Sequence, residues 1–281
     1  MNDILSRDAI LSEMDVEITL ELYSEVTSTN DLARERAAQG AAEGLVILAE
    51  AQSAGRGRFG RSFFSPAGTG LYLSLLLRPE GRTEEALFIT TVAAVAAAEA
   101  IEAIGGVDAK IKWVNDIYCG DKKVCGILTE ASPGRNGQGL AYAILGLGIN
   151  VRPPEQAVPQ ELIGKLGTVF QSGDAVQNER NRLAAEFLNR FFNYYRDRMK
   201  QDALRAYRER SYLNGKTVEV RGTGANELTG GIAGRRAFVL GVDEAYRLRV
   251  RWEDGTEAVL QSGEVRVVPE NDLFGKARKN E

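Results

Sequence analysis

Three mainly apolar runs limit what this chain can fold into more than any other feature. They are GLVILAEAQ at residues 44–52, GLYLSLLLRP at residues 70–79 and LAYAILGLGINV at residues 140–151. Apolar runs of this length, bounded by glycine or proline, predict strands that are buried in a sheet. We therefore expect a globular domain that contains buried strands.

Helices are predicted between and after these strands. Ser28, Thr29 or Asn30 is a candidate cap for a short helix that Gly40 ends. The alanine-rich stretch at residues 86–106 carries two glutamates, so it predicts a buried helix rather than a membrane span. From residue 178 onward, apolar residues recur at helical spacing, namely Leu183, Phe187, Leu188, Phe191 and Tyr195.

The pattern changes at about residue 214. Short strands punctuated by glycine follow, and the pair Asp254-Gly255 is typical of a tight hairpin turn. The sequence therefore predicts a main domain over residues 1–213 and a small all-β domain, with a tail, over residues 214–281.

Composition excludes several classes of chemistry. The sequence contains no histidine, which rules out Ser-His-Asp and Cys-His catalysis and the HExxH zinc site. Cys119 and Cys125 suit neither a disulfide framework nor a zinc site, and they favour a reduced, cytoplasmic setting. The first residues lack the pattern of a signal peptide. The net charge of −4 gives no overall attraction for nucleic acid, so any basic site has to be local.

The segment AQSAGRGRFGRSFFS at residues 51–65, hereafter the arginine loop, combines glycines with arginines. Its glycines satisfy the spacing G-x-G-x-x-G, but a dinucleotide-binding turn needs a helix directly after them, and here another strand follows. The lysine, catalytic-loop and metal-binding motifs of a kinase are also missing from the sequence.

An interpretation based on the arginines of this loop suits the sequence better than one based on the spacing of its glycines. Arginine binds phosphate through two nitrogens, and neighbouring glycines let backbone amides approach an anion closely. The loop thus predicts an anion site at Arg56, Arg58 and Arg61. Two alternatives stay open, which are a solvated basic loop and a contact to nucleic acid.

A second polar group lies in KWVNDIYCGDKKVCGILTE at residues 112–130. Lys112, Asn115 and Asp116 end one predicted strand, and a tight turn at residues 120–121 leads into a pair of lysines. Polar residues at a strand end, between apolar runs, are a common location for a binding site. The alternative is that Asp116 only stabilises a turn and that the lysines are solvated.

In their order and spacing, STND, GRGRFGR, KWVNDIY, KKVCGILTE and GLGINV resemble the motifs of biotin protein ligases. The resemblance covers nearly the whole chain from about Val16. It implies an α+β fold, in which a mixed-sheet catalytic domain of the class II synthetase type, shared with lipoate ligases, precedes a small SH3-like β domain. Val114 is a departure, because the family usually has proline there. The segment ahead of STND is too short for a helix-turn-helix domain, so the resemblance is to the ligase-only form without an amino-terminal DNA-binding domain.

The resemblance implies a two-step, ATP-dependent and AMP-forming reaction. The carboxylate of biotin attacks the α-phosphate of ATP to give biotinyl-5′-AMP, and a specific lysine of a biotin carboxyl carrier protein then takes the biotinyl group. Mg²⁺ is the implied cofactor, with no metal ligand directly assigned. The implied catalytic residues are Lys123, Arg58 and Asp116, of which Asp116 orients or deprotonates the incoming lysine.

Binding residues follow from the same motifs, position by position. Those for biotin are Ser28, Thr29, Asn30, Gln52, Arg56, Gly57, Arg58, Lys123 and Gly126. Those for ATP are Arg58, Arg61, Lys112, Trp113, Asn115 and Asn150.

The implied partner is a biotin carboxyl carrier domain, of acetyl-CoA carboxylase or of another biotin enzyme. Neither membrane nor DNA is an expected partner, and a homodimer is left open. Three alternatives stay open as well. They are a lipoate or octanoate ligase or transferase of the same fold, an RNA-binding module that uses the arginine loop, and a degenerate ligase that only senses biotin.

Overall fold

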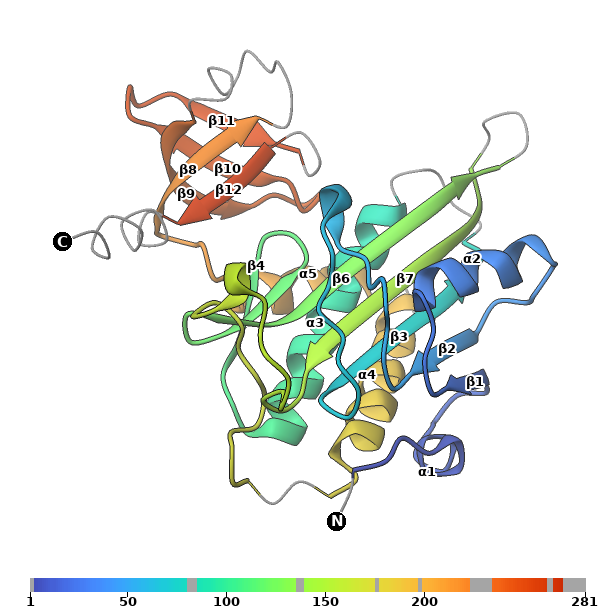
Figure 1. Cartoon of the computed structure of the whole chain (residues 1–281). Helices are drawn as coiled ribbons and strands as arrows, with labels where there is room; N and C mark the ends of the chain where they lie inside the picture. The colour runs from blue at the N-terminus through green and yellow to red at the C-terminus, as the bar shows by residue number, and fades with distance from the viewer. Residues whose placement is uncertain are drawn as a thin grey trace. The chain divides into compact units, whose positions relative to one another are not determined.

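The computed structural model describes residues 3–79, 85–134, 139–174, 177–196, 199–222, 234–261 and 265–269 (Figure 1). The chain divides into two compact units. The first holds residues 1–110 and 115–203, and the second holds residues 111–114 and 204–281. The second unit therefore includes a four-residue segment from the middle of the chain, which no pattern in the sequence indicates.

Apart from the end of β4, the first unit contains a seven-stranded mixed sheet in the order β1-β2-β3-β7-β6-β5-β4. β1 and β2 are parallel, and the pairs from β2 to β5 are antiparallel. The three apolar runs form β2, β3 and β7, and every residue of β2 and β3 is buried, which confirms the predicted buried strands. The strands are β1 (Thr19–Tyr23), β2 (Leu45–Ala49), β3 (Gly70–Leu77), β4 (Ala109–Lys112), β5 (Asp116–Cys119), β6 (Lys122–Pro133) and β7 (Leu140–Asn150).

Helices cover both faces of this sheet. α2 (Thr29–Ala38) packs on β2, β3 and β7, and its alanines meet Ile47, Leu76 and Ile144. α3 (Glu85–Gly105) packs on β6 and on α4 (Glu179–Arg196). Neighbouring residues of a strand point to opposite faces of the sheet. Glu130 of β6 pairs with Ile144, which packs against α2, whereas Thr129 bonds to Thr90 of α3. The helices α2 and α3 therefore lie on opposite faces. The short helix α1 (Arg7–Leu11) packs on α4.

Helix α3 is long and apolar enough to cross a membrane, judged by length and composition alone. Within the fold, 72% of its most apolar window is buried, and the helix packs against β6 and α4. The prediction of a buried helix is therefore confirmed. The helix ends at Gly105, and Gly106 follows with a φ of 64°, which glycine adopts at little cost.

Two other local predictions are confirmed, and one needs correction. Ser28 is the N-cap of α2, and residues 120–121 form the turn between β5 and β6. The single strand predicted ahead of that turn is wrong, because residues 113–115 form a turn that separates β4 from β5. The turn residues bond outside a β5 ladder: the carbonyl of Val114 accepts from the hydroxyl of Tyr207 at 3.2 Å, and the carbonyl of Asn115 accepts from the amide of Ile127 at 3.0 Å.

The second unit carries a five-stranded antiparallel sheet in the order β11-β10-β9-β8-β12. β10 alternates buried with exposed residues: Leu248, Val250 and Trp252 are buried, while Arg249 and Arg251 are exposed. The predicted turn at Asp254-Gly255 joins β10 to β11. The unit also contains most of α5 (Lys200–Glu209). Its strands are β8 (Thr217–Gly222), β9 (Arg235–Val242), β10 (Leu248–Trp252), β11 (Glu257–Leu260) and β12 (Val265–Pro269), and the tail after residue 269 lies outside the described residues.

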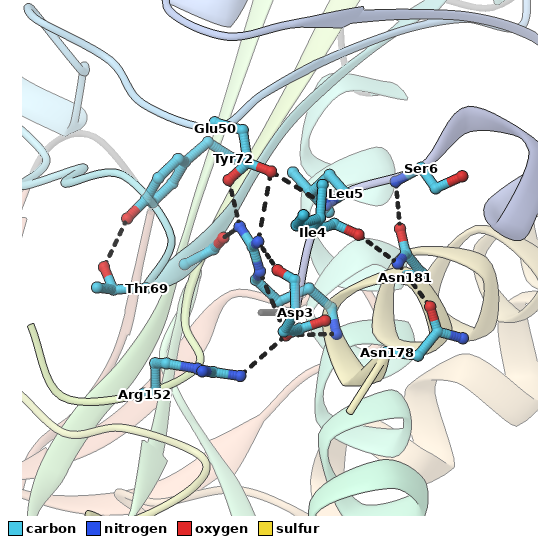
Figure 2. A network of polar contacts seen from close by, with 12 residues as sticks. Asp3, Ile4, Leu5, Ser6, Glu50, Thr69, Tyr72, Arg152, Asn178 and Asn181 are labelled. Atoms are coloured by element: carbon cyan, nitrogen blue, oxygen red, sulfur yellow. Dashed lines mark hydrogen bonds and ion pairs between the residues drawn. The ribbon is translucent and has the colours of Figure 1, made fainter. Parts of the chain in front are cut away.

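A buried arginine, Arg180, ties the amino-terminal segment to the sheet. Figure 2 labels its two acidic partners, Asp3 and Glu50. Arg180, in the first turn of α4, is 2% exposed, and it donates to Glu50 Oε2 at 2.6 Å and to Asp3 Oδ2 at 3.3 Å. It also donates to the backbone carbonyls of Asp3 and Gly70. Glu50 in turn accepts the amide of Leu5 at 3.0 Å. Because Glu50 directly precedes the arginine loop, these bonds fix the point where that loop begins.

We predict that Arg180→Met lowers the free energy of unfolding by about 3–5 kcal/mol, since it leaves two carboxylates without their shared cation. Urea denaturation measures the change. Arg190→Met, on the same helix, is the matched control: its pair with Glu99 is one-third exposed on the arginine side and should contribute less than about 1 kcal/mol. Equal losses in the two variants would contradict a special role for the buried cluster.

Candidate functional site

A pocket lies on the face of the sheet that α2 covers. Its walls come from the start of α2, the arginine loop, β6 and β7. All of the residues that the resemblance assigns to biotin line it. The lining residues are Ser28, Thr29, Asn30, Gln52, Arg56, Gly57, Arg58, Phe63, Leu73, Asn115, Lys123, Gly126, Ile127, Leu128, Gly146, Leu147 and Gly148.

Three glycines form part of the pocket floor. Gly126 of β6 pairs with Gly148 of β7, and Gly146 lies two residues earlier on the same face of β7. A Cβ at Gly148 would lie 2.5 Å from the ring of Phe63, and a Cβ at Gly146 would overlap the side-chain oxygen of Asn30. The floor therefore has to be bare backbone for these side chains to reach it.

The start of α2 presents a buried polar network to the pocket. Thr29 donates from both its amide and its hydroxyl to Gln52 Oε1, at 2.9 and 3.1 Å. Ser74 of β3 lies 2.8 Å from the Thr29 hydroxyl and 2.5 Å from Asn30 Oδ1. Ser74 is fully buried and Asn30 is 4% exposed, so the amide of Asn30 is held in one orientation. No pattern in the sequence indicates a role for Ser74, which lies inside an apolar strand.

The arginine loop folds back on itself as an arch. Phe63 donates its amide to Gly55 at 2.8 Å, and Gly57 donates to Arg61 at 2.7 Å. At the tip, Phe59 has a φ of 58° and a side chain that is 54% exposed. Burial raises the pKa of Tyr72 to about 12, so its hydroxyl stays protonated and donates to Pro66 at the end of the loop.

An inner charged group lies where the arch meets β5 and β6, and we call Arg58, Asn115, Asp116 and Lys123 the inner cluster. Arg58 donates to Asn115 Oδ1 at 2.7 Å, and Lys123 Nζ donates to Asp116 Oδ1 at 2.7 Å. The amide nitrogen of Asn115 donates to the carbonyl of Ile127 at 2.8 Å and to Asp116 at 3.2 Å. These bonds link the two cationic side chains through one amide and one carboxylate.

A β-bulge determines where Lys123 points. Asp116 pairs with Gly126, but the register shifts after Ile117, so that Tyr118 pairs with Lys123. Without the extra residue, Lys123 would share a face with Cys125, away from the pocket. The backbone of Lys123 is held by the segment that follows β7, through bonds of 3.0 Å to Lys165 and 2.8 Å to Gly167.

A second charged group lies at the pocket rim, and we call Asp31, Arg34, Arg56 and Glu130 the rim cluster. Arg56 donates to Asp31 at 2.6 Å and pairs with Glu130 at 2.9 Å. Arg34 bridges the same two carboxylates at 2.7 and 3.0 Å. The hydrogen bond to Asp31 raises the pKa of the Arg56 guanidinium, which therefore stays charged.

Four of the residues that the resemblance assigns to ATP do not line this pocket, namely Arg61, Lys112, Trp113 and Asn150. Asn150 lies next to it, because its side chain donates to the backbone carbonyl of Lys123 at 3.4 Å. The indole of Trp113 donates to Tyr246 within the second unit at 2.9 Å. Arg61 follows the tip of the arch, opposite Gly57, and is exposed. Whether these four residues bind nucleotide stays a prediction.

Neither cysteine offers a nucleophile at neutral pH. Burial raises the pKa of the Cys125 thiol, and burial also raises that of Cys119, to about 11. Within the described ranges, no group of three or more Asp, Glu or Cys side chains is placed to hold a metal ion. Fixed cations, amides and a glycine floor thus define a small-molecule site suited to an anion.

Comparisons with known proteins agree with this class of site. Residues 22–150 match the Biotin/lipoate A/B protein ligase family. The chain is 31% identical over 270 residues to the bifunctional ligase/repressor BirA of Bacillus spizizenii, covering 92% of this chain and 80% of that protein. It is 29% identical to a biotin–[acetyl-CoA-carboxylase] ligase of Mycobacterium tuberculosis, covering 75% and 77%.

A solved structure shows the same fold. The biotin protein ligase of Aquifex aeolicus, in complex with biotin and ATP, superposes with a TM-score of 0.70 at 24% identity, covering 90% of this chain and 99% of that one. The chain belongs to the biotin/lipoate A/B protein ligase family. Since the Bacillus relative is named a repressor as well as a ligase, the expected lack of DNA binding stays a prediction.

We predict that Gly146→Ala lowers the free energy of unfolding by about 1–3 kcal/mol, because its Cβ meets the fixed amide of Asn30. Gly126→Ala is the matched control on the neighbouring strand. There the nearest atom is Lys123 Nζ at 3.1 Å, the end of a flexible side chain, so a smaller loss is expected. Urea denaturation compares the two variants, and an equal or larger loss for Gly126→Ala would contradict the account of the floor.

Proposed function

We propose that this protein is an ATP-dependent biotin protein ligase, which activates biotin as biotinyl-5′-AMP and transfers it to a lysine of a biotin carboxyl carrier domain. The observation that carries the proposal is the inner cluster. It brings Arg58 of the arginine loop and Lys123 of β6 to one pocket over a floor of glycine. Family membership and the named activities of the relatives support it.

The first step suits a chain without histidine. A carboxylate is already ionised at neutral pH, so it needs no general base to attack the α-phosphate. The new bond joins a biotin carboxylate oxygen to phosphorus, and pyrophosphate leaves with the electron pair. The barrier is repulsion between two anions, and one cation at ~4 Å in an effective dielectric of ~20 offsets about 4 kcal/mol of it. Arg58 and Lys123 are both placed to provide such charge.

Mg²⁺ fits this pocket as an ion that arrives with the nucleotide. It is usually held by phosphates, water and one or two protein oxygens rather than by a full set of side chains, which agrees with the few oxygen donors of the inner cluster. The side-chain oxygen of Asn115, which lines the pocket, is the one we assign to it. When bound, it neutralises phosphate charge.

In the second step, the amine of the carrier lysine attacks the carbonyl of the mixed anhydride. An amide bond forms, AMP leaves, and the amine loses a proton. A lysine has a reference pKa near 10.4, so it has to be deprotonated before it attacks. Asp116 does not itself line the pocket, but its carboxylate lies 2.7 Å from the ammonium of Lys123, which does. We assign it the task of orienting the amine or taking its proton.

The partner and the cellular setting belong to the same proposal. The carrier domain of acetyl-CoA carboxylase, or of another biotin enzyme, is the proposed acceptor. The cytoplasm is the proposed location, which two free cysteines support.

The test is a mass measurement. The protein is incubated with biotin, Mg²⁺-ATP and a carrier domain, and the carrier should gain the mass of one biotinyl group. An unchanged carrier mass, with ATP not consumed, would overturn the proposal.

We predict that Lys123→Ala and Arg58→Ala each lower the rate of carrier modification by at least about a hundredfold, because each removes a cation from the reacting anions. Both variants should keep the circular dichroism spectrum of the parent. The matched control is Lys122→Ala, since Lys122 is exposed and does not line the pocket. Full activity in both pocket variants would show that the site is misplaced.

A lipoate ligase or octanoyl transferase is the nearest alternative, because the family includes lipoate ligases. Isothermal titration separates the two substrates. We predict that biotin binds at least tenfold more tightly than lipoate; the reverse order would favour the alternative.

A further inference from the structure

The resemblance assigns Arg56 to biotin, yet its side chain has other partners. Its guanidinium bonds to Asp31 at 2.6 Å and to Glu130 at 2.9 Å, and neither of these carboxylates lines the pocket itself. Arg34 pairs with the same two acids, so the rim cluster holds two positive and two negative groups. Such a cluster adds no net charge for a phosphate or a carboxylate to meet.

The position of each member shows what the cluster connects. Asp31 and Arg34 lie on α2, and Glu130 lies on β6, so three of the four residues belong to helix and strand. Arg56 alone belongs to the arginine loop. Glu130 also accepts from Asn30 at 2.8 Å, which joins the cluster to the buried network at the start of α2. The rim cluster therefore attaches the loop to the rigid part of the fold.

Arg56 and Arg58 stand two residues apart and reach different places. Arg56 bonds at the rim, and Arg58 bonds to Asn115 inside the pocket. Between them, Gly57 donates its amide to Arg61 across the arch. Holding Arg56 at the rim thus limits how far Arg58 can move from the inner cluster.

We propose that Asp31 and Glu130 are positioning residues, which hold the arginine loop over the pocket through Arg56 and so keep water from the reactive intermediate. The inference deepens the proposed function and rests on it for the nature of that intermediate. An acyl-adenylate hydrolyses when water reaches it. A loosened loop therefore lets AMP form without modification of the carrier.

The first experiment needs no activity. Trypsin cleaves after arginine, so Arg56, Arg58 and Arg61 are its candidate sites in the loop. The double variant Asp31→Asn with Glu130→Gln leaves all three sites in place. Each exposed pair contributes modestly, so we expect the double variant to be cut in the loop about fivefold faster, as followed by mass spectrometry. The single variant Asp31→Asn, which leaves the bond from Asn30 to Glu130 intact, should be cut at an intermediate rate.

Two variants serve as controls. Glu21→Gln removes the partner of Arg36, an ion pair of similar exposure on the same helix and outside the pocket. Arg34→Gln removes the other cation of the rim cluster and leaves both acids to Arg56. Loop cleavage at the parent rate is expected for each. Equal rates in the double variant and the parent would overturn the proposal.

The second experiment measures coupling. With biotin, Mg²⁺-ATP and a carrier domain, the ratio of AMP to modified carrier should be near one in the parent and at least twofold higher in the double variant. A ratio that stays at the parent value, although the loop is cut faster, would overturn the link to water exclusion. A parent that never modifies the carrier would refute the proposed function instead, and the trypsin result would still decide whether the rim cluster holds the loop.

Discussion

The pairing of β6 with β7 is the interaction on which the rest of the site depends. Gly126 pairs with Gly148, so two positions without side chains lie side by side and open the floor. β6 also carries Lys123 near its start and Glu130 near its end. At about 3.3 Å per residue, these two positions, seven residues apart, lie roughly 23 Å apart along the strand. One hydrogen-bonded strand thus sets the distance between the inner cluster and the rim cluster.

The two clusters hold different arginines of the loop in different electrostatic surroundings. At the rim, Arg56 meets two carboxylates and its charge is balanced. In the inner cluster, Arg58 bonds to the neutral amide of Asn115, and Lys123 pairs with Asp116. A chain without histidine has no side chain that titrates near neutral pH in its ordinary range. In the proposed first step, fixed charges placed by a strand and a tethered loop lower the barrier without a titrating base.

The sequence predicts the parts of this site better than their arrangement. Buried strands and the cap at Ser28 follow from apolar runs and from residue type, which act locally. The bulge that turns Lys123 toward the pocket depends on pairing with another strand, and no local pattern reports it. Ser74 is hidden for a similar reason, since only the fold brings it to Asn30. Gly146 and Gly148 did carry a signal, because glycines two apart in an apolar strand share one face.

The two attachments of the arginine loop, at its beginning and at Arg56, differ in exposure, so they respond differently to salt. Arg180 fixes the beginning of the loop through Glu50, and the two side chains are 2% and 24% exposed, so dissolved ions screen this pair less. Arg56 and Asp31 at the rim are 39% and 41% exposed, within reach of counter-ions. High salt therefore weakens the Arg56–Asp31 ion pair more than the Arg180–Glu50 pair. The middle of the arginine loop is then released while its beginning stays attached.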